Sequence, residues 1–569
     1  MTRLVNTASE FAAEALAGYA AAQSHRVAPV RGGVVRSTQS PDGQVGIVMG
    51  GGSGHFPAFA GWVGIGFGHG AACGNIFASP SEAQILSVAR AADNGGGLLF
   101  MPINYAGDIL HFTAAAEDLR AEGKDVRMVV ITDDIASAPA ESRSTRRGIA
   151  GSFLVLKMVG AAAEQGIRLD ELERIAVKAN EATRTFGVAF AGCTLPGSAE
   201  PLFAVPAGKV AIGLGIHGEP GISETELESA DHVADILVDG LFEERAPERG
   251  RAVAVLVNGL GATKYDELHV VFGRVRNRLE AEGMRLVAPV VGEQVTSLDM
   301  AGVSVSLAYL DEELEGLWLA PADTASFSRG EVGLRRERAV EERGEGASEI
   351  AAGSQESRAI AAELTRVLQS VAELLAEKEQ WLGTIDAVAG DGDHGAGMLR
   401  GARAAAEAAQ RAQEQEAGAG TVLRIAADAW SDRGGGTSGA LWGVGLAAAG
   451  TVIGDERAPE VQTVVAAVRA YVRSIADRGG AAQGDKTMMD AMIPFADSLE
   501  REVAGGLALR DAWRKAAEAS TQAAEETAEI VSKRGRSRLH GTRSIGTPDA
   551  GAISFALIVS RIGDALQSS

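Results

Sequence analysis

Hydrophobic residues follow two different patterns along the chain, and the pattern changes near residue 330. From residue 45 to residue 320, short apolar and β-branched runs alternate with longer stretches rich in Ala, Glu and Arg. The runs are GIVM, GLLFMPI, RMVVITD, AVAVLVNG and RLVAPV, and the period-2 segment VSVSLAYL adds a further strand. Strands that alternate with helices are typical of crossover connections. This part of the chain therefore predicts an α/β fold with largely parallel sheets.

The last third of the chain lacks such runs and predicts helices only. A segment without any apolar period, SRGEVGLRRERAVEERGEGASEIAAGSQ, separates the two parts and has the charges, glycines and serines of a linker. We place this linker at residues 331–356, between an α/β domain over 1–330 and an all-α domain over 357–569. The clearest helical stretches of the second domain are 360–382, 402–417, 461–476, 507–531 and the final segment.

Composition narrows the possible partners. The chain has 569 residues, of which 46% are apolar and 22% charged, as in proteins that bury several cores. A net charge of −22 repels polyanions, so we expect neither nucleic acid nor an anionic membrane as a partner. Two cysteines, Cys73 and Cys193, provide no disulfide framework and indicate a reducing cytoplasm.

Two segments could be mistaken for membrane or secretion signals. The N-terminal MTRLVNTASEFAAEAL contains acidic residues where a secretory signal has an unbroken apolar core, so it predicts an ordinary first helix. The apolar run 439–454 is rich in glycine and shorter than the ~18 residues that indicate a membrane span. We expect a buried helix there.

Three aspartates gather in the helical third. Asp386, Asp391 and Asp393 stand at i, i+5 and i+7 in TIDAVAGDGDHG, where glycines let the backbone fold tightly. Their oxygens can point at one centre, which hard divalent cations favour. An EF-hand is excluded because the later ligand positions hold Gly and Ala. The alternative is a solvated helix-to-loop junction with exposed acids.

Two further segments could bind phosphate. Residues 434–439, GGGTSG, precede a helix, where free N–H groups and two hydroxyls form an anion cradle. The basic stretch 533–543 could neutralise phosphates or be an exposed charge run. No GxxxxGK[ST] motif occurs, so metal-binding carboxylates would have to replace the P-loop lysine. Together these segments suggest a nucleoside triphosphate held through Mg²⁺.

The α/β part offers a site for the phosphoryl acceptor. The loops GGGSGH, NYAGD and ITDDIAS each follow a strand, and loops at the carboxyl ends of strands converge. They bring His55 and Asp108, and GLGIHGEPG adds His217. A single histidine is more often structural than catalytic. A histidine flanked by glycines can also present a ring nitrogen as a nucleophile to a carbonyl.

The motifs now resemble a known family. GGGSGHFPAFAGWVG, GNIFASPS, NYAGD, TDDIAS, RRGIAG, GCTLPG, GLGIHGEPG, VNGLG and TSLDMAG are followed by DAVAGDGDHGAGM, GGTSGALWG, GDKTMMDA and SIGTPDAGA. In this order, they are similar to those of the ATP-dependent dihydroxyacetone kinase family across nearly the whole chain. The resemblance implies a ketose-binding K domain of two α/β subdomains, at about 1–185 and 186–330, and an ATP-binding L domain built as a helical barrel. It also implies a homodimer through the K domain.

The resemblance further implies roles for individual residues. His217 would form a covalent hemiaminal with the ketone, His55 would hydrogen-bond the substrate and Asp108 would be the general base. Asp386, Asp391 and Asp393 would hold Mg²⁺ on the nucleotide phosphates. The ketose site would include Gly52, Ser53, Gly54, Phe56, Phe59 and Ile103, and the nucleotide site His394, Gly436, Thr437, Ser438, Gly484, Met488, Arg536, Asp549 and Gly551. A covalent tether suits a ketose that is too small for strong noncovalent binding, and it rejects glycerol, which has no carbonyl.

The sequence departs from the family at the substrate loop. Members that act on dihydroxyacetone typically carry Glu, His and Lys where this chain has Phe56, Phe59 and Ile103. The pattern is more similar to the erythrulose kinases, which favours a C4 ketose, with dihydroxyacetone as the close alternative. These three positions could instead face packing. Two other functions stay open: use of the same ATP site to cyclise FAD, and a non-catalytic sugar sensor, which would not need the aspartates.

Overall fold

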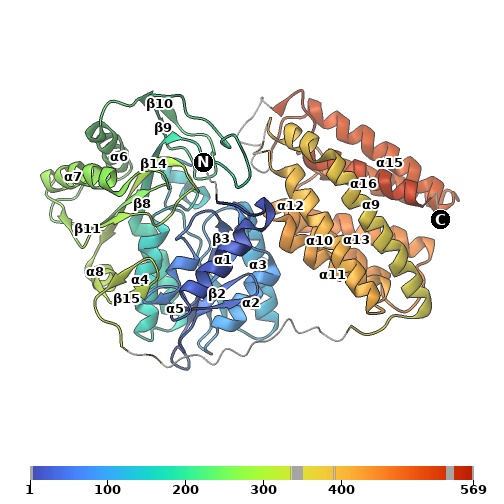
Figure 1. The fold of residues 1–569 in the computed structure, drawn as a ribbon, viewed down its shortest axis with the longest axis horizontal. Coiled ribbons are helices and arrows are strands. Elements are labelled where there is room, and N and C mark those ends of the chain that lie inside the picture. Colours follow the sequence, from blue (N-terminus) through green and yellow to red (C-terminus); the bar gives the residue numbers. More distant parts are fainter. Residues whose placement is uncertain are drawn as a thin grey trace. The chain divides into compact units, whose positions relative to one another are not determined.

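The computed structural model describes residues 4–333, 335, 350–388, 390, 392–533 and 544–566. The chain divides into two compact units, Met1–Glu341 and Glu342–Ser569, coloured from blue to green and from yellow to red in Figure 1. The first unit is α/β and the second helical, so the predicted fold class is confirmed. Most of the segment expected as a linker lies outside the described residues.

The first sheet of the α/β unit has a parallel centre. Parallel pairing joins β5, β3, β6 and β7, while β1 and β2 add an antiparallel edge beside β5. The order across the sheet is β1 (Val27–Val30), β2 (Gly33–Arg36), β5 (Gly70–Ile76), β3 (Gly46–Ser53), β6 (Leu98–Phe100) and β7 (Val126–Met128).

Helices cover both faces of this sheet. Val48 of β3 belongs to a core with residues of α2 (Glu82–Ala92) and α3 (Ala106–Ala121). Its neighbours Ile47 and Met49 belong to a different core, with residues of α1 (Phe11–Ala22), α4 (Ser152–Glu164) and α5 (Leu169–Ala182). Successive strand residues point to opposite faces. The unbroken apolar run GIVM therefore reflects burial on both sides of the sheet.

The second sheet corrects the expectation of largely parallel sheets. β10, β9, β8, β14 and β11 pair antiparallel in that order, and only β12 and β13 run parallel to β11. The reason is that β14 lies between β8 and β11 and opposes both. The strands are β8 (Thr183–Ala191), β9 (Lys209–Ile212), β10 (Ser223–Glu226), β11 (Ala252–Gly259), β12 (Arg285–Leu286), β13 (Val290–Gly292) and β14 (Ala301–Leu310).

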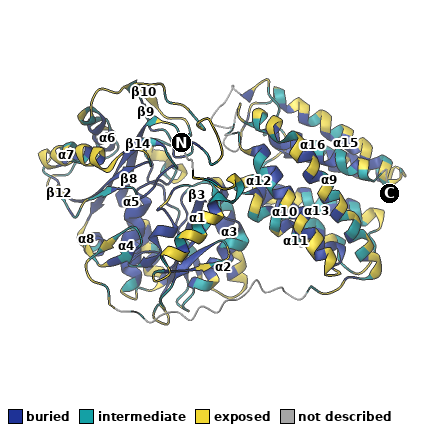
Figure 2. Ribbon diagram, in the orientation of Figure 1, coloured by how far each residue is buried: buried dark blue, intermediate teal, exposed yellow. Residues whose placement is uncertain are grey.

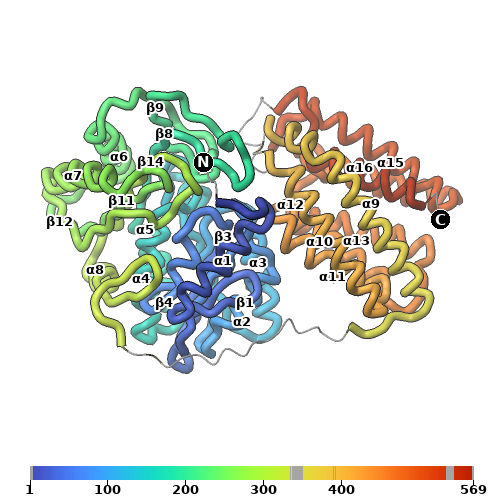
Figure 3. The backbone as a smooth tube through the Cα atoms, in the orientation of Figure 1, coloured from blue at the N-terminus to red at the C-terminus, as the bar shows by residue number. Residues whose placement is uncertain are grey.

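Two helices form a second core against this sheet. α6 (Ala230–Glu244) and α7 (Tyr265–Ala281) pack on apolar residues of β8, β11 and β14, and Figure 3 shows both beside that sheet. After α8 (Glu312–Leu319), the strands β15 (Ala322–Thr324) and β16 (Ser328–Arg329) form a small sheet with β4 (Gly64–Ile65). The end of the unit is thereby joined to the segment that follows the glycine loop.

The helical unit closes on itself. Each of its eight described α-helices contacts the next in the chain, and the last returns to contact the first, which confirms the predicted helical barrel. Figure 2 shows these helices buried on one side and exposed on the other. They are α9 (Gln355–Asp386), α10 (His394–Glu414), α11 (Ala419–Gly434), α12 (Gly436–Ile453), α13 (Val461–Gly479), α14 (Met489–Ala504), α15 (Leu509–Glu526) and α16 (Ala550–Ala565).

One helix of the barrel is unusually apolar. By length and composition, α12 is the single helix in the described ranges that could cross a membrane, and 39% of its window is buried. It packs against α11 and α13. Length and composition are weak evidence for a span, because core helices of soluble proteins share both properties.

Candidate active site

The segment predicted as a glycine-rich loop is strand up to Ser53, the last residue of β3, because its small residues continue the strand pairing; the loop itself begins at Gly54. The chain turns at Gly54, whose φ of +100° suits glycine and strains other residues. A Cβ atom at Gly54 would lie 2.8 Å from the ring of Phe77, and one at Gly52 would lie equally close to the Phe77 backbone. Ser53 Oγ donates to a backbone carbonyl of β5 at 2.6 Å. This close packing fixes His55, which is buried.

His55 and His217 meet in the α/β unit. Their Nε2 atoms lie 2.9 Å apart, and their rings are nearly perpendicular, with centroids separated by 4.8 Å. The other nitrogen of each ring is also engaged. Nδ1 of His55 lies 2.7 Å from the Thr296 carbonyl oxygen, and Nδ1 of His217 lies 3.1 Å from Oε1 of Glu219. Two loops far apart in the sequence thus place two imidazoles face to edge.

Two aromatic side chains border the histidine pair. Phe77 stacks on His55 at a centroid distance of 4.9 Å and meets His217 edge-on at 5.1 Å. Tyr105 meets His217 edge-on from another side at 4.8 Å. Its hydroxyl is buried, which raises the pKa of the phenol well above its usual value. These contacts surround the imidazoles with apolar carbon and restrict the orientation of both rings.

Burial decides the charge of His55. Desolvation, followed by the charge of His217, lowers the pKa of His55 to about 3. The carbonyl of Thr296 can only accept a hydrogen bond, so Nδ1 of His55 carries the proton there. A neutral His55 therefore presents the lone pair of Nε2 to His217.

Glu219 is a buried carboxylate behind His217. Its Oε2 accepts from the backbone N–H of His217 at 2.9 Å, while its Oε1 faces Nδ1 of the same residue. Burial alone would raise the pKa of Glu219, but the charge and hydrogen bond of His217, together with Arg147, hold it well below its usual range. Arg147 lies 3.7 Å from Glu219 and 2.8 Å from Asp134. Glu219, Arg147 and Asp134 thus form a row of alternating charges that begins at the His217 imidazole.

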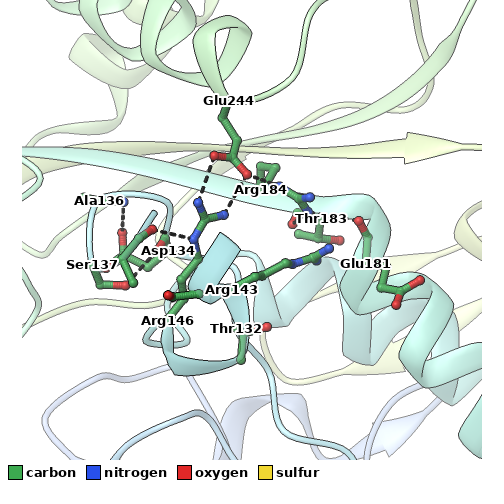
Figure 4. Close-up of polar contacts among 12 residues, drawn as sticks. Thr132, Asp134, Ala136, Ser137, Arg143, Arg146, Glu181, Thr183, Arg184 and Glu244 are labelled. Carbon is green, nitrogen blue, oxygen red and sulfur yellow. Dashed lines mark hydrogen bonds and ion pairs between the residues drawn. The ribbon is translucent and has the colours of Figure 1, made fainter. Parts of the chain in front are cut away.

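The segment that carries Asp134 and Arg147 is itself held in place. In Figure 4, Oδ1 of Asp134 accepts from the Ala136 N–H, at 3.0 Å. The adjacent Arg146 forms a paired contact with both carboxylate oxygens of Glu244, at 2.7 and 2.8 Å. Arg146 is buried. A paired guanidinium–carboxylate contact of this kind has a defined direction as well as a charge, so Arg147 stands on a rigid backbone.

Asp108 is buried in the first turn of α3. The N-cap of that helix is Tyr105, which contacts the His217 ring. The loop between β6 and α3 therefore approaches the histidine pair, as the order of strand and motif predicts. A carboxylate in the first turn of a helix is also stabilised by the helix dipole.

The three substitutions at the substrate loop occupy different environments. Phe59 is 4% exposed, belongs to the core, and its ring would be 2.5 Å from a Cβ atom at Gly51. Ile103 is also in that core and bridges to Ile131. Phe56 is 55% exposed and meets the ring of Tyr19 at 5.4 Å. Phe59 and Ile103 face packing, whereas Phe56 lies at the surface beside His55.

In the helical unit, Asp386 ends α9 and Asp393 is the N-cap of α10. Oδ2 of Asp386 accepts from the Gly392 N–H at 2.8 Å. Burial raises the pKa of Asp386, and the charge of Asp393 raises it further, so the two carboxylates lie close together. Asp391 lies outside the described residues. Within the described ranges, no group of three or more His, Cys, Asp or Glu side chains has the geometry of a metal site.

The first and last helices of the barrel contribute neighbouring acids. Asp549 is the N-cap of α16, where its Oδ1 accepts from the Ala552 N–H at 2.8 Å. Burial, followed by the charges of Asp386 and Asp490, raises the pKa of Asp549 to about 7. His394 joins α10 to the same helix through Ser554 Oγ, 3.0 Å from its Nε2. Carboxylates that disfavour each other's ionisation in this way fit a site for a bound cation.

The remaining described residues expected at the nucleotide site lie at helix starts, except Gly484, which lies in the turn before α14. Gly436, Thr437 and Ser438 form the first turn of α12, where unpaired N–H groups favour an anion. Met488 is the N-cap of α14, and Asp490 in the first turn accepts from the Gly484 N–H at 2.5 Å.

Gly551 lies in the first turn of α16, where a Cβ atom would lie 3.1 Å from Asp549 Oδ1 and 3.4 Å from Met488 Cβ. Arg536 lies outside the described residues.

Reasoning from the sequence missed several residues of these sites. Glu219, Arg147 and Phe77 fall inside motifs that carry the family resemblance, but their importance depends on contacts between distant loops. Lys486 is likewise buried and donates to the Ile530, Ser544 and Thr547 carbonyls at 3.1, 2.5 and 2.8 Å. Its sequence signal is a lysine inside an otherwise apolar and acidic motif, GDKTMMDA.

Comparison with known proteins shows to which family the chain belongs. Residues 17–326 match the Dak1 domain and residues 388–564 match the DAK2 domain. The chain belongs to the dihydroxyacetone kinase family. This confirms the resemblance seen in the motifs.

Relatives in this family align along the whole chain. An L-erythrulose 1-kinase of Mycolicibacterium smegmatis is 51% identical, with 100% of both chains covered. The human triokinase/FMN cyclase is 34% identical, covering 100% of this chain and 99% of its own. The crystal structure of the dihydroxyacetone kinase of C. freundii has a TM-score of 0.53 and 29% identity, with 99% of both chains covered.

Proposed function

We propose that the protein is an ATP-dependent kinase that phosphorylates a terminal hydroxyl of a short-chain ketose. The observation that carries this proposal is the His55–His217 pair, with Nε2 atoms 2.9 Å apart and both Nδ1 atoms engaged. Among the hydrogen bonds of the described residues, the two Nε2 atoms contact only each other, so a substrate that separates them can engage both. The relatives named erythrulose kinase and triokinase support the same reaction class.

In this proposal, His217 holds the ketose. Its Nε2 adds to the carbonyl carbon and forms a hemiaminal, while His55 hydrogen-bonds the substrate at the carbonyl oxygen. Asp108 then takes the proton of the terminal hydroxyl, which attacks the γ-phosphorus of ATP and displaces ADP. The tether supplies binding free energy that a sugar of three or four carbons lacks, and it fixes the reacting hydroxyl, which is worth several kcal/mol of the barrier.

The helical unit supplies the nucleotide site. Asp386 and Asp393, with Asp391, would hold Mg²⁺ on ATP, and the crowding of Asp386 by Asp393 and Asp549 fits a cation at this position. Mg²⁺ neutralises charge on the transferring phosphoryl group. The nucleotide would lie among His394, Gly436, Thr437, Ser438, Gly484, Met488, Asp549, Gly551 and Arg536. A C. freundii dihydroxyacetone kinase at 28% identity was solved with AMP-PNP and Mg²⁺.

The preferred ketose is erythrulose, with dihydroxyacetone as the alternative. Two relatives at 48–51% identity are named L-erythrulose 1-kinase and D-erythrulose kinase. Of the three substitutions in the substrate loop, Phe56 is the one whose exposure beside His55 leaves it free to meet a longer sugar. Gly52, Ser53 and Gly54 position the loop, while Phe59 and Ile103 support it from the core. We further propose a cytoplasmic homodimer joined through the K domain.

ATP consumption with a panel of acceptors tests this proposal. The panel contains dihydroxyacetone, glyceraldehyde, both erythrulose enantiomers and glycerol, each with the wild type and His217→Ala. We expect turnover with a ketose, none with glycerol, and a collapse of turnover in the variant while binding of an ATP analogue persists. Unchanged kinetics in His217→Ala would refute the tether. Release of AMP from FAD with Mn²⁺, independent of His217, would instead indicate the cyclase activity carried in the name of the human relative.

A further inference from the structure

Both carboxylate oxygens of Glu219 lie within hydrogen-bond distance of His217. One carboxylate oxygen lies 3.1 Å from Nδ1 of the ring and the other accepts from the backbone N–H at 2.9 Å. Only a carboxylate provides two acceptors in this position, because an amide would place an NH₂ group against one of the two donors. The geometry therefore selects an ionised Glu219 and a proton on Nδ1 of His217.

The charge of Glu219 is maintained by its surroundings. Arg147 approaches Glu219 within 3.7 Å and is anchored by Asp134 at 2.8 Å. All three side chains are largely buried, with exposures of 12%, 13% and 3% for Glu219, Arg147 and Asp134. A buried carboxylate is stable only when it is paired and hydrogen-bonded. Arg147 and His217 together meet this requirement.

The contacts of the two rings call for one proton shared between their Nε2 atoms. Nδ1 of His55 must donate to the Thr296 carbonyl, and Nδ1 of His217 must donate to Glu219. If both rings were neutral, two lone pairs would face each other across 2.9 Å. One proton between the Nε2 atoms removes this repulsion, and the neighbouring carboxylate favours its residence on His217. The resting pair is then a His217 imidazolium that donates to His55.

We propose that Glu219 is a positioning residue that fixes the tautomer of His217 and pairs with the cationic ring before and after the ketose adds. This inference rests on the proposed hemiaminal. As the ketose adds, the Nε2 proton of His217 passes to Nε2 of His55, and the Nε2 lone pair forms the bond to the carbonyl carbon. The π electron pair of the carbonyl moves to oxygen, which takes the proton from His55. The product is an N-alkylated imidazolium with a neutral hydroxyl, and Glu219 still accepts from its Nδ1–H.

This balance gives Glu219 an energetic role beyond orientation. The net charge of the site is the same before and after addition, so no proton is exchanged with solvent. His55 is neutral at both ends of the step and carries the proton only between them. Without the carboxylate, the positive ring would be buried without the group that pairs with both His217 and Arg147. Its formation would then be strongly disfavoured.

The test uses the full chain, dihydroxyacetone labelled with ¹³C at the carbonyl, and no ATP. Adduct formation converts the carbonyl resonance into that of a tetrahedral carbon bonded to oxygen and nitrogen. We expect Glu219→Gln to lower the adduct population at a subsaturating ketose concentration by about tenfold, the lower end of the loss seen when partners that orient metal-binding histidines are removed. Glu224→Gln, an exposed glutamate on β10, is the matched control and should match the wild type.

A second measurement reads the tautomer directly. Nitrogen-15 spectra of histidine-labelled wild type should show His217 with a protonated Nδ1, and Glu219→Gln should lose this signature. A bare Nδ1 in the wild type, or wild-type adduct formation in folded Glu219→Gln, would overturn the role of Glu219. If Glu219→Gln does not fold, the wild-type spectrum alone decides. Loss of the tether itself is a separate result: an unchanged adduct in His217→Ala contradicts the proposed function, whatever Glu219 does.

Discussion

Lys157 is a fully buried lysine in the α/β unit, at 0% exposure in the middle of α4. Its ammonium group donates to the Leu317 carbonyl in the last turn of α8, at 2.8 Å. Burial, with a smaller contribution from Arg329, lowers the pKa of Lys157 from 10.5 to about 7. We therefore predict that Lys157→Met changes how the stability of this unit depends on pH.

The sign follows from the number of protons bound. Between pH 7 and pH 10.5 the unfolded chain keeps the Lys157 proton while the folded unit has lost it, so the free energy of unfolding rises with pH. Below pH 7 both states are protonated and this residue adds no slope. At about 1.4 kcal/mol for each pH unit, the whole effect is about 5 kcal/mol. The donated hydrogen bond offsets part of it, because its loss leaves the Leu317 carbonyl without that donor at a cost of about 1–3 kcal/mol.

Urea unfolding at a series of pH values measures this effect. Lys157→Met should be more stable than the wild type by about 2–4 kcal/mol at pH 7 and below, and the advantage should disappear towards pH 10.5. Lys209→Met, at a half-buried lysine of β9 that pairs with the exposed Glu226, is the control. Parallel pH profiles for the wild type and Lys157→Met would show that the Lys157 amine is solvated or paired with an acid, and would contradict the lowered pKa.

Three other predictions concern the two sites. Phe59→Ala should destabilise the α/β unit by about 3–5 kcal/mol, as for other buried aromatics. Phe56 is exposed, so Phe56→Ala should change the melting temperature of the unit little and alter the ketose preference. Equal losses of melting temperature in the two variants would contradict this. Lys486→Met should weaken binding of an ATP analogue in calorimetry without affecting ketose binding, because three backbone carbonyls lose their donor; unchanged affinity would exclude this role. Asp549→Asn keeps a residue that caps helices well but removes one charge, so the helical unit should melt higher in EDTA and gain less from Mg²⁺; an unchanged Mg²⁺ response would argue against a cation there.

The sequence predicted most accurately where the signal is local. The uniformly apolar GIVM run indicates a strand buried on both faces, and β3 is such a strand. The period-2 pattern of VSVSLAYL indicates a strand, but it does not predict which strands pair with it. β14 in fact lies antiparallel between β8 and β11. Pairing direction depends on which distant segment arrives beside a strand, and periodicity holds no information on that.

The same limit applies to the site. His55 and His217 are conspicuous because each lies next to a glycine in a glycine-rich motif, and the structure places them in contact. Glu219 has no such signal, since a glutamate in a glycine- and proline-rich loop is typical of a solvated turn. Its role depends on Arg147, which comes from another loop. For Phe59, only the packing against Gly51 distinguishes core support from a substrate contact.

Because α16 returns to α9, the beginning and the end of the helical unit are neighbours in space. Asp386 closes the first helix and Asp549 opens the last one, so the acidic centre formed by Asp386, Asp393 and Asp549 is incomplete on a chain that lacks α16. During synthesis, the three acids come together only after the final helix has docked. Because these two ends are adjacent, a circular permutant of the helical unit should keep the acidic centre. In this permutant the original ends are joined and new termini are opened between α12 and α13.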